Sequence, residues 1–433
     1  MGMSMGHAPL TPTSAEPDIR SASTSPSVVA QRHNAEIAIV GGGLSGSLAA
    51  VVLGRAGYRV ALIDRHAVYP AEFRVEKIAG DQVELIRRLG LLDALASVST
   101  PFDQVLNIRH GEILDRSNSQ HFGVLYEDLV RAVRAQLPAS VTFHVGRVVD
   151  LHAGPERQQV MLESGDVIDA RLIVVATGMG DALRHKVGIR RRVVVEKQSL
   201  SFGFTMVPGA GETFEFPALT YYGERVADRI DYLSLFPIGA TMRANLFTFR
   251  DHRDPWIRAL RQEPKATLLA ALPGLKPFLG DFRVIDKVQN WLMDLTVAED
   301  CRRDGVVLIG DAFQTSCPAA GTGVSRLLAD VDRLCNVHLP HWLATPGMNA
   351  DKIAQFYDDP VKQAADARAT RLAHYRRALT IKTGPYWAMR RRQLYLRRRA
   401  LAWIDQRSPA WAARLAALRT GKRWVAGKLG SHG

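Results

Sequence analysis

One segment near the N-terminus constrains the fold of this chain more than any other. Residues 37–64 begin with four apolar residues, continue into Gly41, Gly43 and Gly46, and then run through a mostly apolar stretch to a second apolar strand ending in Asp64. A strand, a glycine-rich turn, a helix, a second strand and a terminal acid follow one another in the order of a dinucleotide-binding β-α-β unit. The segment therefore predicts an α/β fold with a parallel sheet and a nucleotide-binding edge.

Each residue type in this segment has a physical role. Gly41 permits the tight turn, Gly43 lets the backbone approach a pyrophosphate, and Gly46 lets the helix pack against the strand. The N-terminus of the helix offers free N–H groups to phosphate charge. Asp64 can accept hydrogen bonds from a ribose hydroxyl, and Arg65 beside it is included among the predicted cofactor contacts.

A second motif, far downstream, indicates which dinucleotide is bound. An apolar run at residues 306–309 leads into Gly310, and the motif continues to Leu334. It resembles the downstream motif of the FAD-dependent monooxygenases with an aromatic-hydroxylase-like fold, which are related to flavin-dependent halogenases and geranylgeranyl-reductase-type flavoproteins. Gln314 and Ser325 stand where that family usually has His and Asn. The matching residues are Gly310, Asp311, Ala312, Pro318, Gly321, Gly323, Asp330 and Leu334.

The resemblance implies FAD as the cofactor. It implies that Asp311 binds the ribityl and ribose side, that Gly321 and Gly323 approach the flavin ring, and that Pro318 belongs to the same site. Glycines that open a helix expose N–H groups that can stabilise a reduced, anionic flavin. Cys317 is expected to be a buried thiol or a neighbour of the flavin, and no catalytic residue is assigned.

Two further segments resemble the family only in part. Arg74 lies in a loop from which an arginine of the family reaches the cofactor, although a solvated loop arginine is the alternative. Tyr126 stands where the family often has Arg or Gln, so no role is transferred to it. Gly178 is kept as a cofactor contact, but Thr177 replaces the usual Asp before it. NAD(P)H as electron donor is therefore in question, and a partner reductase or a non-oxygenase reaction is the alternative.

The predicted fold is α/β, with a Rossmann-like FAD-binding domain, an inserted antiparallel β-sheet substrate domain and a C-terminal basic helical extension. The boundaries follow the motifs and the alternation of apolar residues. The predicted units are a disordered lead at 1–34, the first FAD-binding part at 35–185, the substrate sheet at 186–284, the second FAD-binding part at 285–350, and basic helices at 351–433.

Within the inserted sheet, residues 199–207, 231–237 and 242–250 read as strands, with residues 236–239 as a turn. Aromatic residues of this region either line the substrate pocket or pack in the core, and packing is the more common use of an aromatic on a sheet. They are Phe202, Phe204, Phe214, Phe216, Tyr221 and Tyr222.

Composition narrows the class of protein. The chain has 433 residues, of which 47% are hydrophobic and 23% charged, enough for two globular domains. Its three cysteines do not suggest a disulfide scaffold, and no His/Cys cluster suggests a metal. No secretory leader and no transmembrane run is evident. A cytoplasmic protein is expected, with the membrane surface as an alternative location.

The C-terminal tail carries the excess charge. Residues 371–433 contain 16 Lys and Arg and a single acid, which gives +15, whereas the whole chain is +13. Met389, Leu396 and Trp403 form a heptad seam, and Ser408 begins a last helix with its own apolar face. Three interpretations stay open: docking on the catalytic body, contact with an anionic membrane surface, and docking of an acidic carrier protein. Nucleic acid is disfavoured because no binding motif accompanies the charge.

The functional hypothesis is an FAD-dependent monooxygenase. By resemblance, it inserts one oxygen atom of O₂ into a hydrophobic substrate, lipid-like or aromatic, through a flavin C4a-hydroperoxide. An FAD-dependent lipid reductase or dehydrogenase acting on a C–C bond is the alternative, and a flavin-binding scaffold without turnover is another. A flavin-dependent halogenase ranks lower, because the sequence contains no Trp-x-Trp-x-Ile-Pro motif. The oligomeric state is not predicted.

Overall fold

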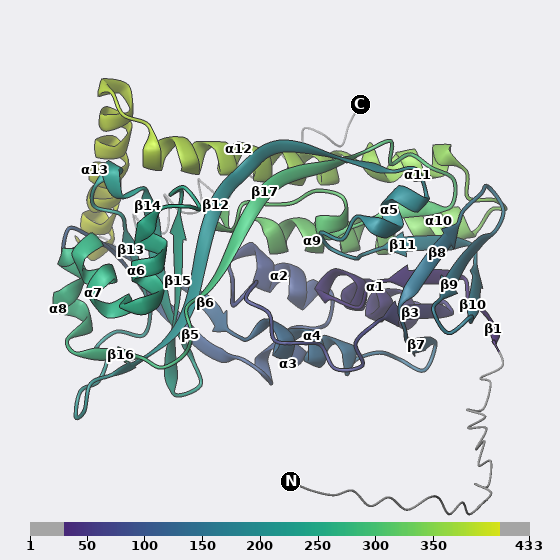
Figure 1. Ribbon diagram of the computed structural model, residues 1–433, viewed down its shortest axis with the longest axis horizontal. Coiled ribbons are helices and arrows are strands. Elements are labelled where there is room, and N and C mark those ends of the chain that lie inside the picture. The colour runs from purple at the N-terminus through teal and green to yellow at the C-terminus, as the bar shows by residue number, and fades with distance from the viewer. Residues whose placement is uncertain (1–29, 408–433) are drawn as a thin grey trace, which may run out of the picture.

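The computed structural model describes residues 30–407, which form two lobes side by side. Figure 1 shows the long β12–β17 ribbon and helix α12 spanning both lobes. The predicted last helix at Ser408 and most of the predicted N-terminal lead lie outside the described residues.

The first lobe is built on a five-stranded parallel sheet. Four of its strands are almost wholly apolar and buried, as expected when both faces of a parallel sheet are covered, whereas the edge strand at residues 141–145 is partly exposed. Their order is β18 (Val306–Leu308), β11 (Leu172–Val175), β2 (Ile37–Val40), β3 (Val60–Asp64) and β7 (Val141–Val145). The predicted β-α-β unit is therefore confirmed as β2, α1 (Leu44–Arg55) and β3.

Helices cover one face of this sheet and a small second sheet covers the other. The helices of the lobe are α1, α2 (Asp81–Arg88), α3 (Leu92–Ala96), α4 (Tyr126–Arg134), α5 (Ala182–Lys186), α9 (Gly323–Asp332), α10 (Leu339–Leu343) and α11 (Ala350–Tyr357). The small sheet has the order β1 (Arg32–Asn34), β10 (Val167–Ala170), β9 (Gln158–Leu162) and β8 (Val148–His152). Because β1 pairs with β10, residues 32–34, which were predicted to belong to the disordered lead, lie in a strand of this sheet.

The second lobe is a nine-stranded sheet that is wider than the predicted insertion at 186–284. It also takes strands from residues 77–123 and 289–299, because the chain enters this sheet twice, over residues 77–123 and again over residues 190–299. The order is β16 (Phe282–Val284), β12 (Arg190–Pro208), β15 (Thr241–Thr248), β14 (Ile230–Ile238), β13 (Leu219–Tyr222), β5 (Thr100–Arg109), β6 (Glu112–Gly123) and β4 (Lys77–Ala79), with β17 (Gln289–Glu299) paired to β12.

The two faces of this sheet have different environments. Phe202 and Phe204 point to a core beneath α6 (Pro255–Gln262), α7 (Pro264–Ala271) and α8 (Lys276–Leu279). Phe216 and Tyr221 are buried in the same core, so the packing interpretation of these aromatics is confirmed for them. The predicted turn at residues 236–239 is wrong for its first three residues, because β14 continues to Ile238 and turns only at Gly239.

Two long helices follow the second lobe. Asp359 caps α12 (Pro360–Ile381) by accepting hydrogen bonds from two backbone N–H groups, and Pro360 occupies its first turn. A break at residues 382–384 separates it from α13 (Pro385–Arg407), which stands at the left end of the molecule in Figure 1. Within residues 30–407, no helix combines the length and the apolar character needed to cross a bilayer.

Helix α13 docks through polar and aromatic side chains instead of its predicted apolar seam. Tyr395 lies 3.9 Å from the guanidinium of Arg109, and Arg398 pairs with Asp115 at 3.2 Å. Met389 and Leu396 of the seam are more than half exposed. Docking of this stripe on the catalytic body is therefore wrong for α13, because the groups that meet the body come from other faces of the helix.

Candidate FAD and substrate site

A cavity of about 600 Å³ lies where the two lobes meet. Ten of the eleven predicted cofactor residues line it, although they come from five separate stretches of the chain. They are Gly41, Gly43, Asp64, Arg65, Arg74, Gly178, Asp311, Pro318, Gly321 and Gly323. The exception is Gly46, which lies below the cavity floor, where the ideal position of an added Cβ is 1.9 Å from the Gly41 carbonyl oxygen.

The glycine turn forms a cradle with space beside it. Gly41 has a φ of +105°, and an added Cβ would lie 2.6 Å from the Ala176 carbonyl oxygen. Gly43 differs, because an added Cβ would meet nothing closer than the Tyr69 hydroxyl at 3.7 Å. Gly43 has no side chain to cap α1, so the backbone N–H groups of its first turn, apart from that of Leu44, which donates to the Tyr126 hydroxyl, remain available to an anion. This fits a pyrophosphate approaching at Gly43.

Asp64 organises the turn as well as facing the cavity. Its carboxylate accepts hydrogen bonds from the backbone N–H groups of Gly42, at 2.6 Å, and His66, at 2.8 Å. A carboxylate has about four acceptor positions, so a ribose hydroxyl can still be bound. Arg134 lies 3.4 Å from the same carboxylate. Arg65 is exposed at the rim of the cavity.

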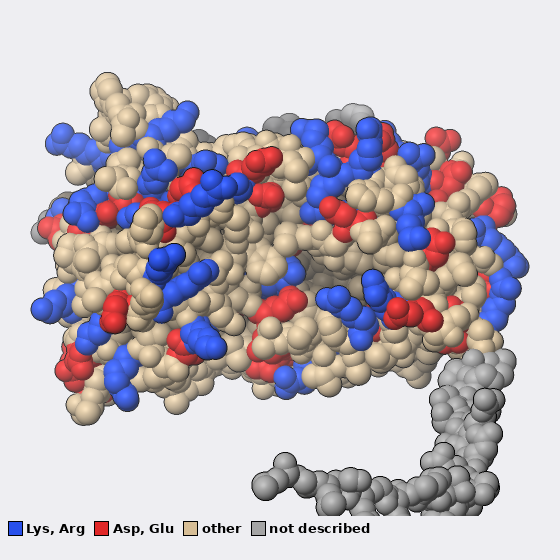
Figure 2. Space-filling view, in the orientation of Figure 1, with Lys and Arg blue, Asp and Glu red and all other residues tan. Residues whose placement is uncertain are grey.

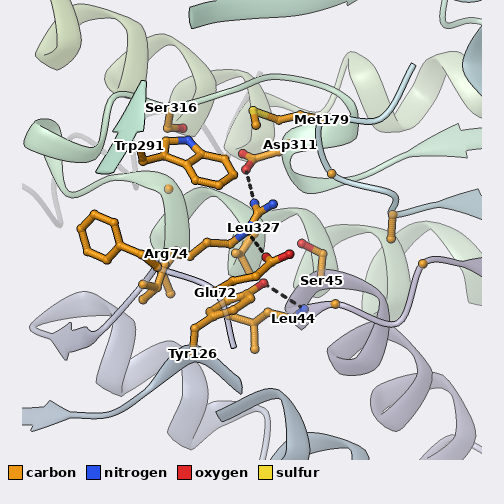
Figure 3. Close-up of a pocket in the computed structure, with 18 of the residues that line it drawn as sticks. Leu44, Ser45, Glu72, Arg74, Tyr126, Met179, Trp291, Asp311, Ser316 and Leu327 are labelled. Carbon is orange, nitrogen blue, oxygen red and sulfur yellow. Dashed lines mark hydrogen bonds and ion pairs between the residues drawn. The ribbon is translucent and has the colours of Figure 1, made fainter. Parts of the chain in front are cut away.

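Arg74 connects the N-terminal loop with the downstream motif. Its guanidinium donates to Glu72 at 2.6 Å, lies 3.8 Å from the Asp311 carboxylate, and stacks 4.7 Å from the centre of the Trp291 ring. Figure 3 shows Arg74 in the middle of the cavity wall, with Trp291 and Asp311 on one side and Tyr126 on the other. The solvated-loop alternative for Arg74 does not describe this position, since the side chain is engaged on three sides.

Tyr126 is a cavity residue that sequence reasoning left without a role. Its hydroxyl accepts a 3.4 Å hydrogen bond from the backbone N–H of Leu44, at the start of α1. Burial raises the pKa of the Tyr126 phenol, so the hydroxyl keeps its proton and can donate to a cofactor oxygen. The family often has Arg or Gln at this position. Tyr126 departs from that pattern but still provides a hydrogen-bond donor.

Three arginines support the Gly310–Ala312 segment from behind; Arg184 and Arg326 are buried, and Arg191 is largely buried. Arg184 donates to the Ala312 carbonyl at 2.6 Å, and Arg191 donates to the Asp311 carbonyl at 3.3 Å. Arg326 lies 3.4 Å from the Asp311 carboxylate. Their burial could not be read from the sequence, because arginines are usually exposed. Together they fix the backbone and the side chain of Asp311 at the cavity wall.

Two residues that line the cavity have buried hydroxyl groups without a partner in the described part of the chain. Thr177 Oγ1 and Ser201 Oγ are buried without a hydrogen-bond partner among residues 30–407, and both residues line the cavity. Buried hydroxyls normally have partners, so these two positions indicate where a bound molecule supplies them. Thr177 lies beside Gly178 on the nucleotide-binding lobe, which fits FAD. Ser201 lies on the nine-stranded sheet, which fits a substrate.

The nine-stranded sheet supplies the opposite wall of the cavity. Its strand register aligns Trp291, Ser201, Phe247 and Tyr232 in one row across β17, β12, β15 and β14. The next row contains Asn245 and Ser234. All of these residues line the cavity, and none was predicted as a site residue. The sequence shows that side chains along these strands alternate between the two faces of the sheet, but this alternation does not tell which face meets the cofactor.

Cys317 lies in the same wall. It is fully buried, lines the cavity and contacts Ser199 Oγ at 3.5 Å. Burial raises the pKa of its thiol, so it remains protonated and unreactive at neutral pH. Both expectations for Cys317, a buried thiol and a position at the site, therefore agree with its placement.

A dinucleotide cradle that opens directly onto a sheet-walled chamber is the arrangement of FAD-dependent oxidoreductases. Residues 34–337 match the family model described as an FAD binding domain, and the chain belongs to that family. The family model and the hydroxylases to which the chain is similar place it among the FAD-dependent monooxygenases.

The similarity to individual proteins is distant but extends over most of the chain. The chain is 29% identical to 3-demethoxyubiquinol 3-hydroxylase of Escherichia coli over 70% of this chain and 79% of that enzyme. It is 25% identical to aklavinone 12-hydroxylase of Streptomyces peucetius over 69% and 66%. Among solved structures, p-nitrophenol 4-monooxygenase from Pseudomonas putida DLL-E4 has a TM-score of 0.68 at 17% identity and covers 90% of this chain and 98% of its own. The last comparison supports the fold alone.

Proposed function

We propose that the protein is a monooxygenase that transfers one oxygen atom of O₂ to a hydrophobic aromatic substrate bound between FAD and the nine-stranded sheet. The observation that carries this proposal is the continuity of the cavity. One space is lined by the glycine cradle and Asp64 at one end and by Phe236, Phe247 and Trp291 at the other. A substrate held on that wall lies against the cofactor, where proximity and exclusion of water favour oxygen transfer.

The overall reaction combines a substrate C–H group, O₂, NAD(P)H and H⁺ to give C–OH, H₂O and NAD(P)⁺. Bound FAD would supply the redox chemistry, carrying two electrons from the donor to oxygen. The protein's own groups bind and orient. The N-terminus of α1 and Asp64 would hold the nucleotide, while Arg74 and Asp311 would fix the flavin side. The aromatic wall excludes water from the reacting atoms.

Labelling the product with ¹⁸O₂ tests this proposal directly. The protein is loaded with FAD, reduced anaerobically by NADH, NADPH or, failing both, dithionite, and mixed with ¹⁸O₂ in the presence of a panel of phenols and naphthols. One ¹⁸O atom in the product, detected by mass spectrometry, is the expected result. Reduction by dithionite but by neither nicotinamide would point to a partner reductase. Failure to bind FAD, or reoxidation without labelled product across the panel, would contradict the proposal.

A further inference from the structure

Lys77 is the feature of the substrate wall that the proposed function does not use. It lies on β4, the edge strand of the nine-stranded sheet, and it lines the cavity. The sheet curls so far that β4 reaches the cavity-facing side of β14. Lys77 Nζ donates a 3.0 Å hydrogen bond to Ser234 Oγ there and lies 5.7 Å from the centre of the Phe236 ring.

The ammonium of Lys77 has no carboxylate partner within 4.0 Å among the residues that the structure describes. The nearest acid in sequence, Glu76, is held by two nitrogens of Arg243 at 2.9 Å each. Arg243 also pairs with Asp286 at 3.0 Å. These carboxylates are therefore already compensated by Arg243.

An unpaired ammonium in such a position is costly. It lies near the Phe236 ring, and burial lowers the pKa of Lys77 to about 8, so the protonated form of the side chain still predominates at pH 7. Taking a charge out of water without a partner is unfavourable, and a bound anion would remove that cost. Ser234 fixes the position of the ammonium, and the unpaired hydroxyl of Ser201 lies on the same face of the sheet.

We propose that Lys77 and Ser234 form an oxyanion subsite in the substrate wall, which takes the phenolate or carboxylate oxygen of an acidic aromatic substrate. The inference rests on the proposed function and deepens it by naming the substrate class. A phenol bound as its phenolate, with its proton released to solvent, is more electron-rich at the ring carbons that accept oxygen. The subsite thus both selects an acidic aromatic molecule and prepares it for hydroxylation.

Equilibrium binding to the FAD-loaded protein tests the subsite without turnover. The probes are two matched pairs, 2-naphthoate with 2-naphthamide and benzoate with benzamide, followed through the change in flavin absorbance. The wild type is expected to prefer the anion of at least one pair by about tenfold or more, the range of a hydrogen bond to a charged group. Lys77→Met should abolish that preference, and Lys77→Arg should restore part of it.

Two controls separate recognition from a structural contact. Lys287→Met removes an exposed lysine outside the cavity and should leave the preference unchanged. Ser234→Ala removes the bond between β4 and β14 but keeps the ammonium, so most of the preference should remain. No anion preference in the wild type, or equal loss in Lys77→Met and Ser234→Ala, would overturn the proposal. A protein that shows the Lys77-dependent preference but never transfers oxygen would retain the subsite and lose the proposed function.

Discussion

At the scale of single residues, two glycines of one motif have different tasks. An added Cβ at Gly43 meets only ordinary contacts, whereas at Gly46 it collides with the backbone of Gly41. We expect Gly43→Ala to leave the melting temperature of the cofactor-free protein unchanged while weakening FAD binding by about tenfold or more, because the methyl group occupies the approach of the pyrophosphate. Calorimetry of FAD binding and thermal unfolding of the apoprotein measure the two effects.

Gly46→Ala should show the opposite pattern. The apoprotein itself should lose about 1–3 kcal/mol of unfolding free energy, since the new methyl group has to displace packed backbone. Gly154→Ala is the matched control, because its nearest atom lies 3.9 Å away and its φ is not positive. An apoprotein of wild-type stability carrying Gly46→Ala would show that α1 does not pack against the turn as described.

At the scale of elements, α13 presents an apolar stripe outward. Tyr386, Met389 and Leu396 are 58%, 51% and 55% exposed, and Arg392 and Arg397 are exposed beside them. In Figure 2 the protruding end of the molecule at the upper left shows an uncharged surface with basic groups around it. Apolar side chains flanked by arginine match the surface of a bilayer that contains anionic lipids.

We therefore expect the protein to sediment with vesicles of phosphatidylcholine and phosphatidylglycerol, and less with phosphatidylcholine alone. Replacing both Met389 and Leu396 by Ser should weaken binding by about tenfold or more, because each buried side chain of this size contributes about 1.5–3 kcal/mol. Ile285→Ser, at a residue 53% exposed outside α13, is the control. If the double variant instead abolishes a dimer seen by ultracentrifugation, and vesicle binding is absent, the stripe serves a second copy of the chain.

At the scale of the whole molecule, a buried charge network joins the C-terminal helices to the cofactor site. Lys362 of α12 is 1% exposed and pairs with Asp330 at 2.9 Å and Asp366 at 3.0 Å. Asp330 in turn accepts a hydrogen bond from the backbone N–H of Gly310, which leads into Asp311. Helix α12 is therefore part of the folded body, and it includes residues 371–381 of the basic tail.

Lys362→Met should destabilise the whole protein. Asp330 and Asp366 lose their ammonium partner and keep Arg326, at 3.6 and 3.4 Å. We expect a loss near the lower end of the about 3–5 kcal/mol that breaking a buried pair costs. The free energy of unfolding in guanidinium measures this loss. The double variant Lys362→Met with Asp366→Asn should recover part of it, because one uncompensated charge is removed. Equal stability of Lys362→Met and the wild type would show that the network is solvated and does not hold α12.

How much of the site could be predicted depended on how far apart in the sequence its interacting residues lie. Gly41 and Asp64 were predictable because their geometry is set by a turn and a strand end within a few residues, and Asp311 and Gly321 because the motif around them resembles that of a known family. Trp291 and Lys77 were not, because they meet only after β17 and β4 join a sheet whose other strands lie far away in the sequence. The face of the sheet on which each aromatic lies could not be fixed from the sequence for the same reason.

The sequence by itself determined the β-α-β unit and the FAD-type glycine motifs, since these depend on backbone conformations that only certain residues adopt. Tertiary structure decided which sheet face became the substrate wall, which arginines were buried behind Asp311, and which side of α13 met the body. Those outcomes depend on packing between segments distant in the chain, where the same side chain is core or site according to the surface it meets.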